Sequence, residues 1–283
     1  MITKNPMQLK AFVKNKAKES GISAQLVMQN FMMERLLERI SLSKYKQNFI
    51  LKGGFLIAAI VGLDSRATMD MDATVKGFDL SHESLQEIFE EICKVAAEDN
   101  ISFDFQRTTD IREGDIYPGF RIHLTANYPP LTVPLVVDVT TGDKITPREI
   151  EYSYRLMFDD RSISVMAYNL ETILAEKLET VLSRNIANTR PRDFYDIYIL
   201  HALHFDNCDV PTLKQALAET TQRRGSVYVL EQYQEIVSNI SHSQQMQSFW
   251  EKYRKEYNYA KNITFENVCD SVLIVMNSIS SSD

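Results

Sequence analysis

The sequence predicts an α+β fold, in which a mixed sheet with flanking helices is followed by an all-helical C-terminal part. Short alternating or β-branched segments recur between residues 48 and 165, whereas the segments after Tyr168 have helical spacing. The first 45 residues also repeat their apolar positions with helical spacing. We therefore expect a domain at residues 1–165, with a helical lead-in, and a helical domain at residues 166–283 that completes a cleft with it.

The individual elements follow from their patterns in chain order. The lead-in is expected to hold a helix at residues 7–20, stopped by Gly21, and a second that Ser23 caps and that reaches residue 40. Strands are expected at residues 48–51, 68–75, 101–109, 119–127, 133–140 and 162–165, with helices between them at 54–61 and 81–98. The C-terminal helices are expected at residues 170–184, 191–203, 212–221, 227–238, 243–257 and 265–279.

The composition excludes several classes of protein. With 31 basic and 38 acidic residues the net charge is −7, so any nucleic-acid partner must meet a local patch rather than a global positive field. The three cysteines are too scattered for a paired disulfide framework or a Cys-rich zinc site. The longest apolar run, residues 55–63, is about half the length of a membrane span. Because no signal-peptide core is present either, we expect a cytoplasmic protein that does not bind membranes.

A double glycine, Gly53 and Gly54, joins a predicted strand to a predicted helix. Such a turn lets backbone N–H groups approach a phosphate at a helix N-terminus, with Lys52 or Arg66 as the positive partner. The alternating segment 68–75 that follows places Asp70 and Asp72 on one face. Neighbouring carboxylates repel each other, whereas Mg²⁺ binds carboxylate oxygens together with substrate phosphates. This pair is therefore expected to bind a divalent metal.

Asp138 stands alone within the aliphatic run of residues 135–139. One interpretation is that it is only the last inward residue before a polar turn. Beside Asp70 and Asp72 it would instead complete a three-carboxylate set able to hold two metal ions during an in-line phosphoryl displacement. In that arrangement Asp138 would also activate the acceptor hydroxyl.

These motifs resemble those of a known group of enzymes. The double glycine, the Asp-x-Asp segment and the later lone Asp are similar to the minimal nucleotidyltransferase fold of the polymerase-β-like superfamily. Two downstream segments, residues 175–184 and 190–198, resemble the Lys-containing helix and the basic-Asp-x-x-Asp helix of the AbiEii/AbiGii toxin family of nucleotidyltransferases. The upstream pattern that resembles the same family is Lys52-Gly53-Gly54 followed by Arg66-x-Thr68-x-Asp70-x-Asp72.

The resemblance implies a Mg²⁺- or Mn²⁺-dependent enzyme that transfers a nucleotidyl group from a nucleoside triphosphate to an RNA acceptor, in relatives the 3′ end of tRNA. It also implies a toxin of a bacterial toxin–antitoxin or phage abortive-infection system, with a cognate antitoxin as partner. The residues expected to bind the nucleotide are Lys52, Gly53, Gly54, Arg66, Thr68 and Arg184. The residues expected to be catalytic are Asp70, Asp72, Asp138, Lys177 and Asp193, the first three as metal ligands.

The downstream residues also have ordinary structural interpretations. Lys177 and Arg184 lie two helical turns apart and share a face that could meet a triphosphate, with Lys177 expected to be exposed. A solvated helix with local Glu partners would look the same. Asp193 follows Pro191 in a first helical turn, where the helix dipole alone favours an acid. The loop of residues 184–192, with three arginines and no acid, is the local candidate for contact with RNA phosphates.

Two other functions stay open. A nucleotidyltransferase acting on a small molecule, such as an aminoglycoside, would use the same Gly-Gly and Asp-x-Asp apparatus, and the C-terminal basic edge is the feature that separates the two. A binding protein whose catalysis has lapsed could keep the same fold. Retention of all three carboxylates argues against that function.

Overall fold

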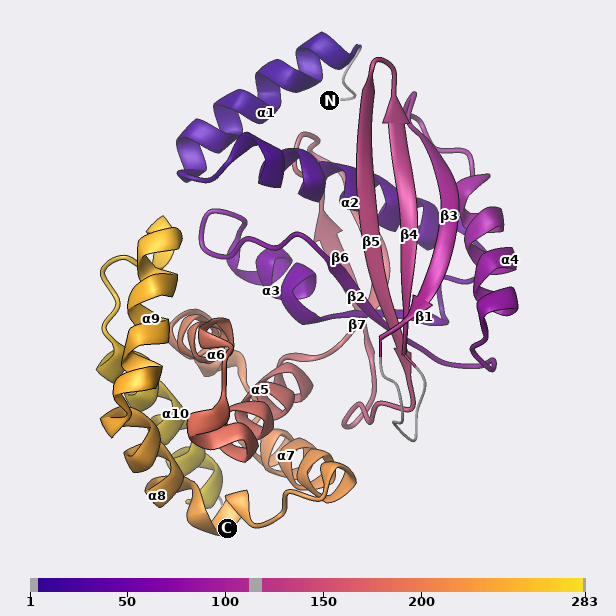
Figure 1. The fold of residues 1–283 in the computed structure, drawn as a ribbon. Helices are drawn as coiled ribbons and strands as arrows, with labels where there is room; N and C mark the ends of the chain where they lie inside the picture. Colours follow the sequence, from indigo (N-terminus) through magenta and orange to yellow (C-terminus); the bar gives the residue numbers. More distant parts are fainter. Residues whose placement is uncertain (1–4, 112–118, 282–283) are drawn as a thin grey trace. The chain divides into compact units, whose positions relative to one another are not determined.

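The computed structural model describes residues 5–111 and 119–281 (Figure 1). The chain forms two compact units. The first unit comprises Met1–Asp143 and Ile150–Ala167, and the second comprises Lys144–Glu149 and Tyr168–Asp283. The sheet lies in the first unit, and the second unit is built from helices.

The first unit contains a seven-stranded mixed sheet with the strand order β3-β4-β5-β2-β1-β7-β6. Strand β2 is the middle strand of this order. It pairs antiparallel with β1 on one side and parallel with β5 on the other. Strand β1 also pairs parallel with β7, and the remaining pairs are antiparallel. The strands are β1 (Phe49–Lys52), β2 (Met71–Val75), β3 (Ser102–Asp110), β4 (Gly119–Tyr128), β5 (Leu131–Thr141), β6 (Ile150–Arg155) and β7 (Ser162–Ala167).

Within residues 5–111 and 119–143, four helices accompany this sheet: α1 (Pro6–Ser20), α2 (Ala24–Leu42), α3 (Gly53–Val61) and α4 (His82–Cys93). Their starts obey local capping rules, since Asn5, Ser23 and Ser81 each accept a hydrogen bond from a backbone N–H in the first turn of α1, α2 and α4. Helix α2 contacts β5 and β7, and α4 contacts β3 (Figure 1). The apolar residues of α2 and α4 thereby close the core of the unit against the sheet.

Helix α2 buries charged residues that a surface helix would expose. Arg35 pairs with Glu34 and with Glu38, both at 2.7 Å. Arg39 forms a two-pronged pair with Asp99, at 3.1 and 2.6 Å, and donates to the carbonyl of Ile101 at 2.5 Å. Buried charges persist only when they are paired and hydrogen-bonded. The Arg35 pairs lie within α2, whereas the contacts of Arg39 with Asp99 and Ile101 fix the helix against the segment that leads to β3.

The second unit holds six helices and three short 3₁₀ turns among its described residues. Trp250, fully buried, donates to the carbonyl of Ile263 at 3.0 Å and anchors α9 against the segment that leads to α10. None of the helices in the described ranges is long and apolar enough to cross a membrane. The helices are α5 (Leu170–Arg184), α6 (Pro191–His204), α7 (Val210–Arg224), α8 (Val229–His242), α9 (Gln244–Glu256) and α10 (Phe265–Ser280), and the 3₁₀ turns are η1 (Asn185–Ala187), η2 (Phe205–Asn207) and η3 (Asn258–Ala260).

The predicted fold class is confirmed, and three elements differ from the prediction. Strand β6 was not predicted, because it is an edge strand in which only Tyr154 is buried. Strand β2 begins at Met71, so Asp70 precedes the strand instead of lying in it. Helix α4 ends at Cys93, five residues before the predicted end. The remaining elements lie where the sequence pattern places them, within a few residues at each end.

Glu34 gives stability a specific dependence on pH. Burial raises the pKa of this carboxyl from 4.5 to about 7, although Arg35 and the Met157 N–H oppose the change. The folded state therefore keeps a proton between about pH 4.5 and 7 that the unfolded chain has lost, so this group makes stability fall as pH rises through that window. Relative to Glu34→Gln, the wild type should lose roughly 3 kcal/mol of unfolding free energy between pH 4.5 and 7.

Denaturant unfolding of both proteins across this pH range measures the difference. Glu87→Gln, at an exposed position of α4, is the matched control and should follow the wild type. A difference between wild type and Glu34→Gln that does not change with pH would contradict this account of the Glu34 carboxyl.

Candidate functional site

One row of charged residues crosses four neighbouring strands of the first unit. Lys52 on β1 is opposite Asp72 on β2, and Asp72 is paired in parallel register with Asp138 on β5. Asp138 is in turn opposite Arg121 on β4. Directly paired residues project to the same face of a sheet. The register therefore brings two of the three predicted carboxylates together and adds a cation that the sequence did not single out.

The double glycine lies directly against this row. Gly53 has φ +66°, a conformation that favours glycine, and a Cβ added there would lie 2.2 Å from Asp72 Oδ2. A Cβ on Gly54 would lie 3.1 Å from both Thr68 Oγ1 and the Arg66 guanidinium. The backbone at the start of α3 can approach these side chains only because both residues lack a side chain. The structure thus groups four predicted site residues, Gly53, Gly54, Arg66 and Thr68, around one turn.

Lys52 belongs to a buried polar cluster at the same end of β1. Its Nζ donates to Thr140 Oγ1 at 2.7 Å and forms an ion pair with Asp143. Asp143 also accepts from Thr74 at 2.6 Å. Burial alone would raise the pKa of Asp143, but the charge and hydrogen bond of Lys52 outweigh it and hold that pKa well below its usual value. Lys52 is therefore tied to a structural carboxylate beside the turn.

Arg121 holds Asp138 by a two-pronged ion pair. Arg121 Nε lies 2.8 Å from Asp138 Oδ1, and Nη2 lies 2.8 Å from Oδ2. The pKa of Arg121 is raised by its hydrogen bonds with Asp138, and the charges of Asp70 and Asp72 add to the effect. All three carboxylates therefore act on the same guanidinium. Asp70, although outside β2, belongs to the same electrostatic site.

The donor set fits a divalent cation at Asp70 and Asp72. Both groups offer carboxylate oxygens, the ligands that Mg²⁺ prefers, and Gly53 leaves space beside Asp72 that a Cβ would fill. Across residues 5–111 and 119–281, however, no three acidic, His or Cys side chains are grouped closely enough to hold a metal ion. Asp138 is adjacent to Asp72 in register, but both its oxygens accept from Arg121.

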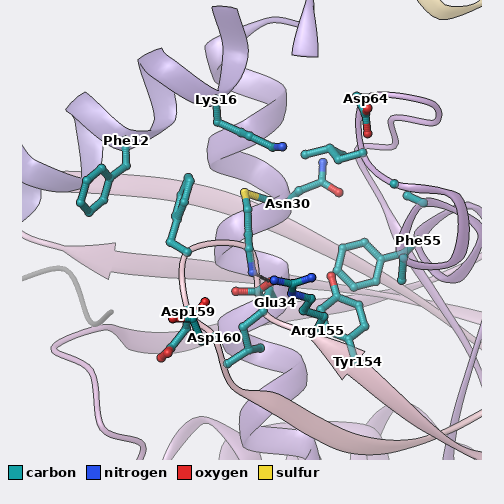
Figure 2. Close-up of a pocket in the computed structure, with 17 residues that line it drawn as sticks. Phe12, Lys16, Asn30, Glu34, Phe55, Asp64, Tyr154, Arg155, Asp159 and Asp160 are labelled. Carbon is teal, nitrogen blue, oxygen red and sulfur yellow. Dashed lines mark hydrogen bonds between the residues drawn. The ribbon is translucent and has the colours of Figure 1, made fainter. Parts of the chain in front are cut away.

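A pocket of about 670 Å³ opens elsewhere in the first unit (Figure 2). Its walls include the stacked rings of Phe55 and Tyr154, with centroids 5.7 Å apart, and the polar side chains of Asn30 and Glu34. The Asn30 amide donates to the Thr68 carbonyl at 2.7 Å. The pocket thus adjoins the segment that leads to Asp70, but none of the three carboxylates lines it.

The second unit gathers Lys177, Asp193 and Asp196 from two consecutive helices. Lys177 Nζ on α5 lies 2.6 Å from Asp193 Oδ1 and 2.9 Å from Asp196 Oδ2 on α6. Helix α6 starts with Pro191 and carries Asp193 in its first turn, as predicted. Burial alone would lower the pKa of Lys177, but the two carboxylates outweigh it and raise that pKa. The ammonium is thus held in its charged form between two buried acids.

The predicted exposure of Lys177 is wrong. Its side chain is only 18% exposed, and the carboxylates that it contacts are 4% and 0% exposed. The pattern was misleading because its partners come from the next helix rather than from Glu residues on its own. Arg184, at the C-terminal end of α5, is exposed together with Arg190 and Arg192. The three arginines therefore form a basic edge around η1, as the sequence indicated.

Arg121 and Asp143 are the site residues that sequence reasoning missed. From Phe120 onward, strand β4 alternates between buried and partly exposed positions, and Arg121 occupies one of the latter. That pattern looks like a solvent-facing row, so only the strand order, which puts β4 beside β5, reveals the contact with Asp138. Asp143 follows β5 in a polar turn and gave no signal of its partnership with Lys52.

Comparison with solved structures identifies the class of fold. Two proteins from Helicobacter pylori share it, each 10% identical to this chain with a TM-score of 0.50. For a nucleotidyltransferase candidate, the match covers 93% of this chain and 99% of that one. For the protein JHP933, it covers 91% and 94%. The chain therefore has a nucleotidyltransferase fold.

The family follows from the sequence match. The family described as "Nucleotidyl transferase AbiEii toxin, Type IV TA system" matches residues 35–270, so the chain belongs to this family of toxin–antitoxin nucleotidyltransferases. The match includes every predicted site residue. A search of curated proteins gives no match.

The Lys177 cluster predicts a stability effect. Lys177→Met removes the cation and leaves two buried carboxylates beside each other, which should lower the free energy of unfolding by about 3–5 kcal/mol. Adding Asp193→Asn and Asp196→Asn to that variant removes both negative charges and should restore most of the loss. Denaturant unfolding measures both effects, with the exposed Lys252→Met as control. A Lys177→Met protein as stable as wild type would show that the three groups are not coupled.

Proposed function

We propose that this chain transfers a nucleotidyl group from a nucleoside triphosphate to an acceptor at the Gly53–Gly54 turn of the first unit. The observation that carries the proposal is the position of Asp72, whose carboxylate lies against a glycine turn at the start of helix α3. A helix N-terminus attracts phosphate. Phosphate and Asp72 are both negative, so a divalent cation is needed between them.

Asp70 and Asp72 would hold that cation, Mg²⁺ or Mn²⁺. Bound there, the ion would neutralise the phosphate oxygens and stabilise the charge that develops during in-line displacement. Gly53 and Gly54 would let the backbone approach the phosphates, while Arg66 and Thr68, beside Gly54, would contact the triphosphate. Lys52 would contribute mainly by keeping the end of β1 in place through Asp143.

The acceptor hydroxyl would attack the α-phosphorus and break the bond to the β-phosphate, so that pyrophosphate leaves. A carboxylate must take the hydroxyl proton, and Asp138 is the candidate because it is adjacent to Asp72 in register. Lys177 and Asp193 of the second unit are also proposed to be catalytic residues. Asp193 Oδ2 is buried and has no hydrogen-bond partner among the described residues, which supports a role beyond its pair with Lys177.

The acceptor is proposed to be RNA, specifically the 3′ end of tRNA. Support comes from family membership and from the exposed Arg184, Arg190 and Arg192, which could meet RNA phosphates without a globally positive charge. Arg184 would then bind RNA or nucleotide. In a toxin–antitoxin system this transfer would be the toxic activity, and a cognate antitoxin would control it.

Transfer of label tests the proposal. The purified protein is incubated with each labelled triphosphate, Mg²⁺ and total bacterial RNA, or with an aminoglycoside mixture in place of RNA. Label should enter RNA of tRNA size, and chelation of the metal should abolish transfer. Asp72→Asn keeps the shape of the side chain beside Gly53 and should lower the rate at least roughly 100-fold, the effect of losing one group that stabilises the transition state.

Asp79→Asn is the matched control, since Asp79 is an exposed acid that follows β2. It should keep wild-type activity. Undiminished transfer by Asp72→Asn would contradict the assignment of the metal site. Label found only in the aminoglycoside would favour a small-molecule acceptor.

A further inference from the structure

Arg121 is placed where it can control access to Asp138. The two side chains project from directly paired positions of β4 and β5 and meet through two parallel hydrogen bonds of 2.8 Å. This fork geometry uses both carboxylate oxygens and is stronger than a single contact. The Asp138 side chain is 16% exposed and that of Arg121 is 41% exposed. The Arg121 guanidinium thus covers the more buried Asp138 carboxylate on its solvent side.

The charge around Arg121 is unusual for an ordinary cross-strand pair. Besides Asp138, the carboxylates of Asp70 and Asp72 also stabilise its charged form. Arg121 thus forms an ion pair with one carboxylate and lies in the electrostatic field of two more. Among the described residues no three acids form a metal-binding group, although the register brings Asp138 next to Asp72.

We propose that Arg121 occupies the position on Asp138 that a divalent cation would take, so that guanidinium and metal compete for this carboxylate. The inference rests on the proposed function, because it concerns the same metal site. Without nucleotide and metal, Arg121 neutralises Asp138 and reduces the repulsion among Asp70, Asp72 and Asp138. When metal binds Asp138, the partly exposed side chain of Arg121 moves away. Arg121 is therefore a positioning residue that sets how tightly the site takes up metal.

This competition makes a directional prediction for metal binding. Loss of the guanidinium makes the local charge more negative by one unit and leaves the Asp138 oxygens without their fork partner. Arg121→Ala should therefore bind Mn²⁺ at least roughly tenfold more tightly than wild type, the factor expected when one charge-assisted interaction no longer competes. A purely structural pair predicts the opposite, because a displaced Asp138 would bind metal less well.

Calorimetric titration with Mn²⁺ alone, in the absence of nucleotide, tests the inference on the full chain. Arg107→Ala is the matched control, since Arg107 is an exposed arginine of neighbouring β3 and lies opposite His123 rather than an acid. Its Mn²⁺ affinity should equal that of wild type. Arg121→Lys keeps the charge but not the fork, and should give an intermediate affinity. If Arg121→Ala does not fold, the Mn²⁺ affinity of Arg121→Lys tests the inference by itself.

A second readout is thermal stability without and with Mn²⁺. Metal should raise the melting temperature of Arg121→Ala by more than that of wild type, because only the variant gains a partner for a bare carboxylate. Unchanged or weaker Mn²⁺ affinity in both variants would overturn the competition and leave the proposed transfer intact. Absence of Mn²⁺ binding in wild type and variants alike would overturn the competition together with the metal dependence of the proposed function.

Discussion

The parallel register between β2 and β5 positions the charged groups on which the rest of the first unit depends. It sets Asp72 beside Asp138, and the antiparallel neighbours then add Lys52 on one side and Arg121 on the other. A shift by one residue would turn these side chains to the opposite face and expose Met71 and Ala73. The burial of the apolar residues of β2 therefore fixes which face carries Asp72.

The glycine turn depends on the same register. Gly53 can lie this close to the Asp72 side chain only because it lacks a Cβ and adopts a positive φ. Lys52, the residue before it, is anchored by Asp143 and Thr140. The turn is thus fixed at one end by a buried ion pair and at the other by helix α3. This rigidity is what a site needs if backbone and carboxylate are to bind one ligand together.

Much of this arrangement could be predicted from the sequence, and the remainder has identifiable physical reasons. Periodicity and turn chemistry were enough for the order of the α-helices and of every strand except β6, for the place of Gly53 and for the helix start at Pro191. Contacts between segments far apart in the chain could not be predicted from the sequence. The partnership of Arg121 with Asp138 depends on strand order, and edge strand β6 lacks the buried alternation that reveals a strand. Lys177 was expected to be exposed because the spacing within its own helix gives no information on Asp193 and Asp196, its partners on the next helix.

The most direct test of the account is the location of the metal. Crystals of the protein grown with Mn²⁺ and a non-hydrolysable nucleoside triphosphate would be measured at the manganese absorption edge, where anomalous scattering marks the ion. The account predicts a manganese peak bound by Asp70 and Asp72, with triphosphate oxygens on the same ion and against the Gly53–Gly54 turn. A nucleotide bound elsewhere, or manganese away from both carboxylates, would contradict it.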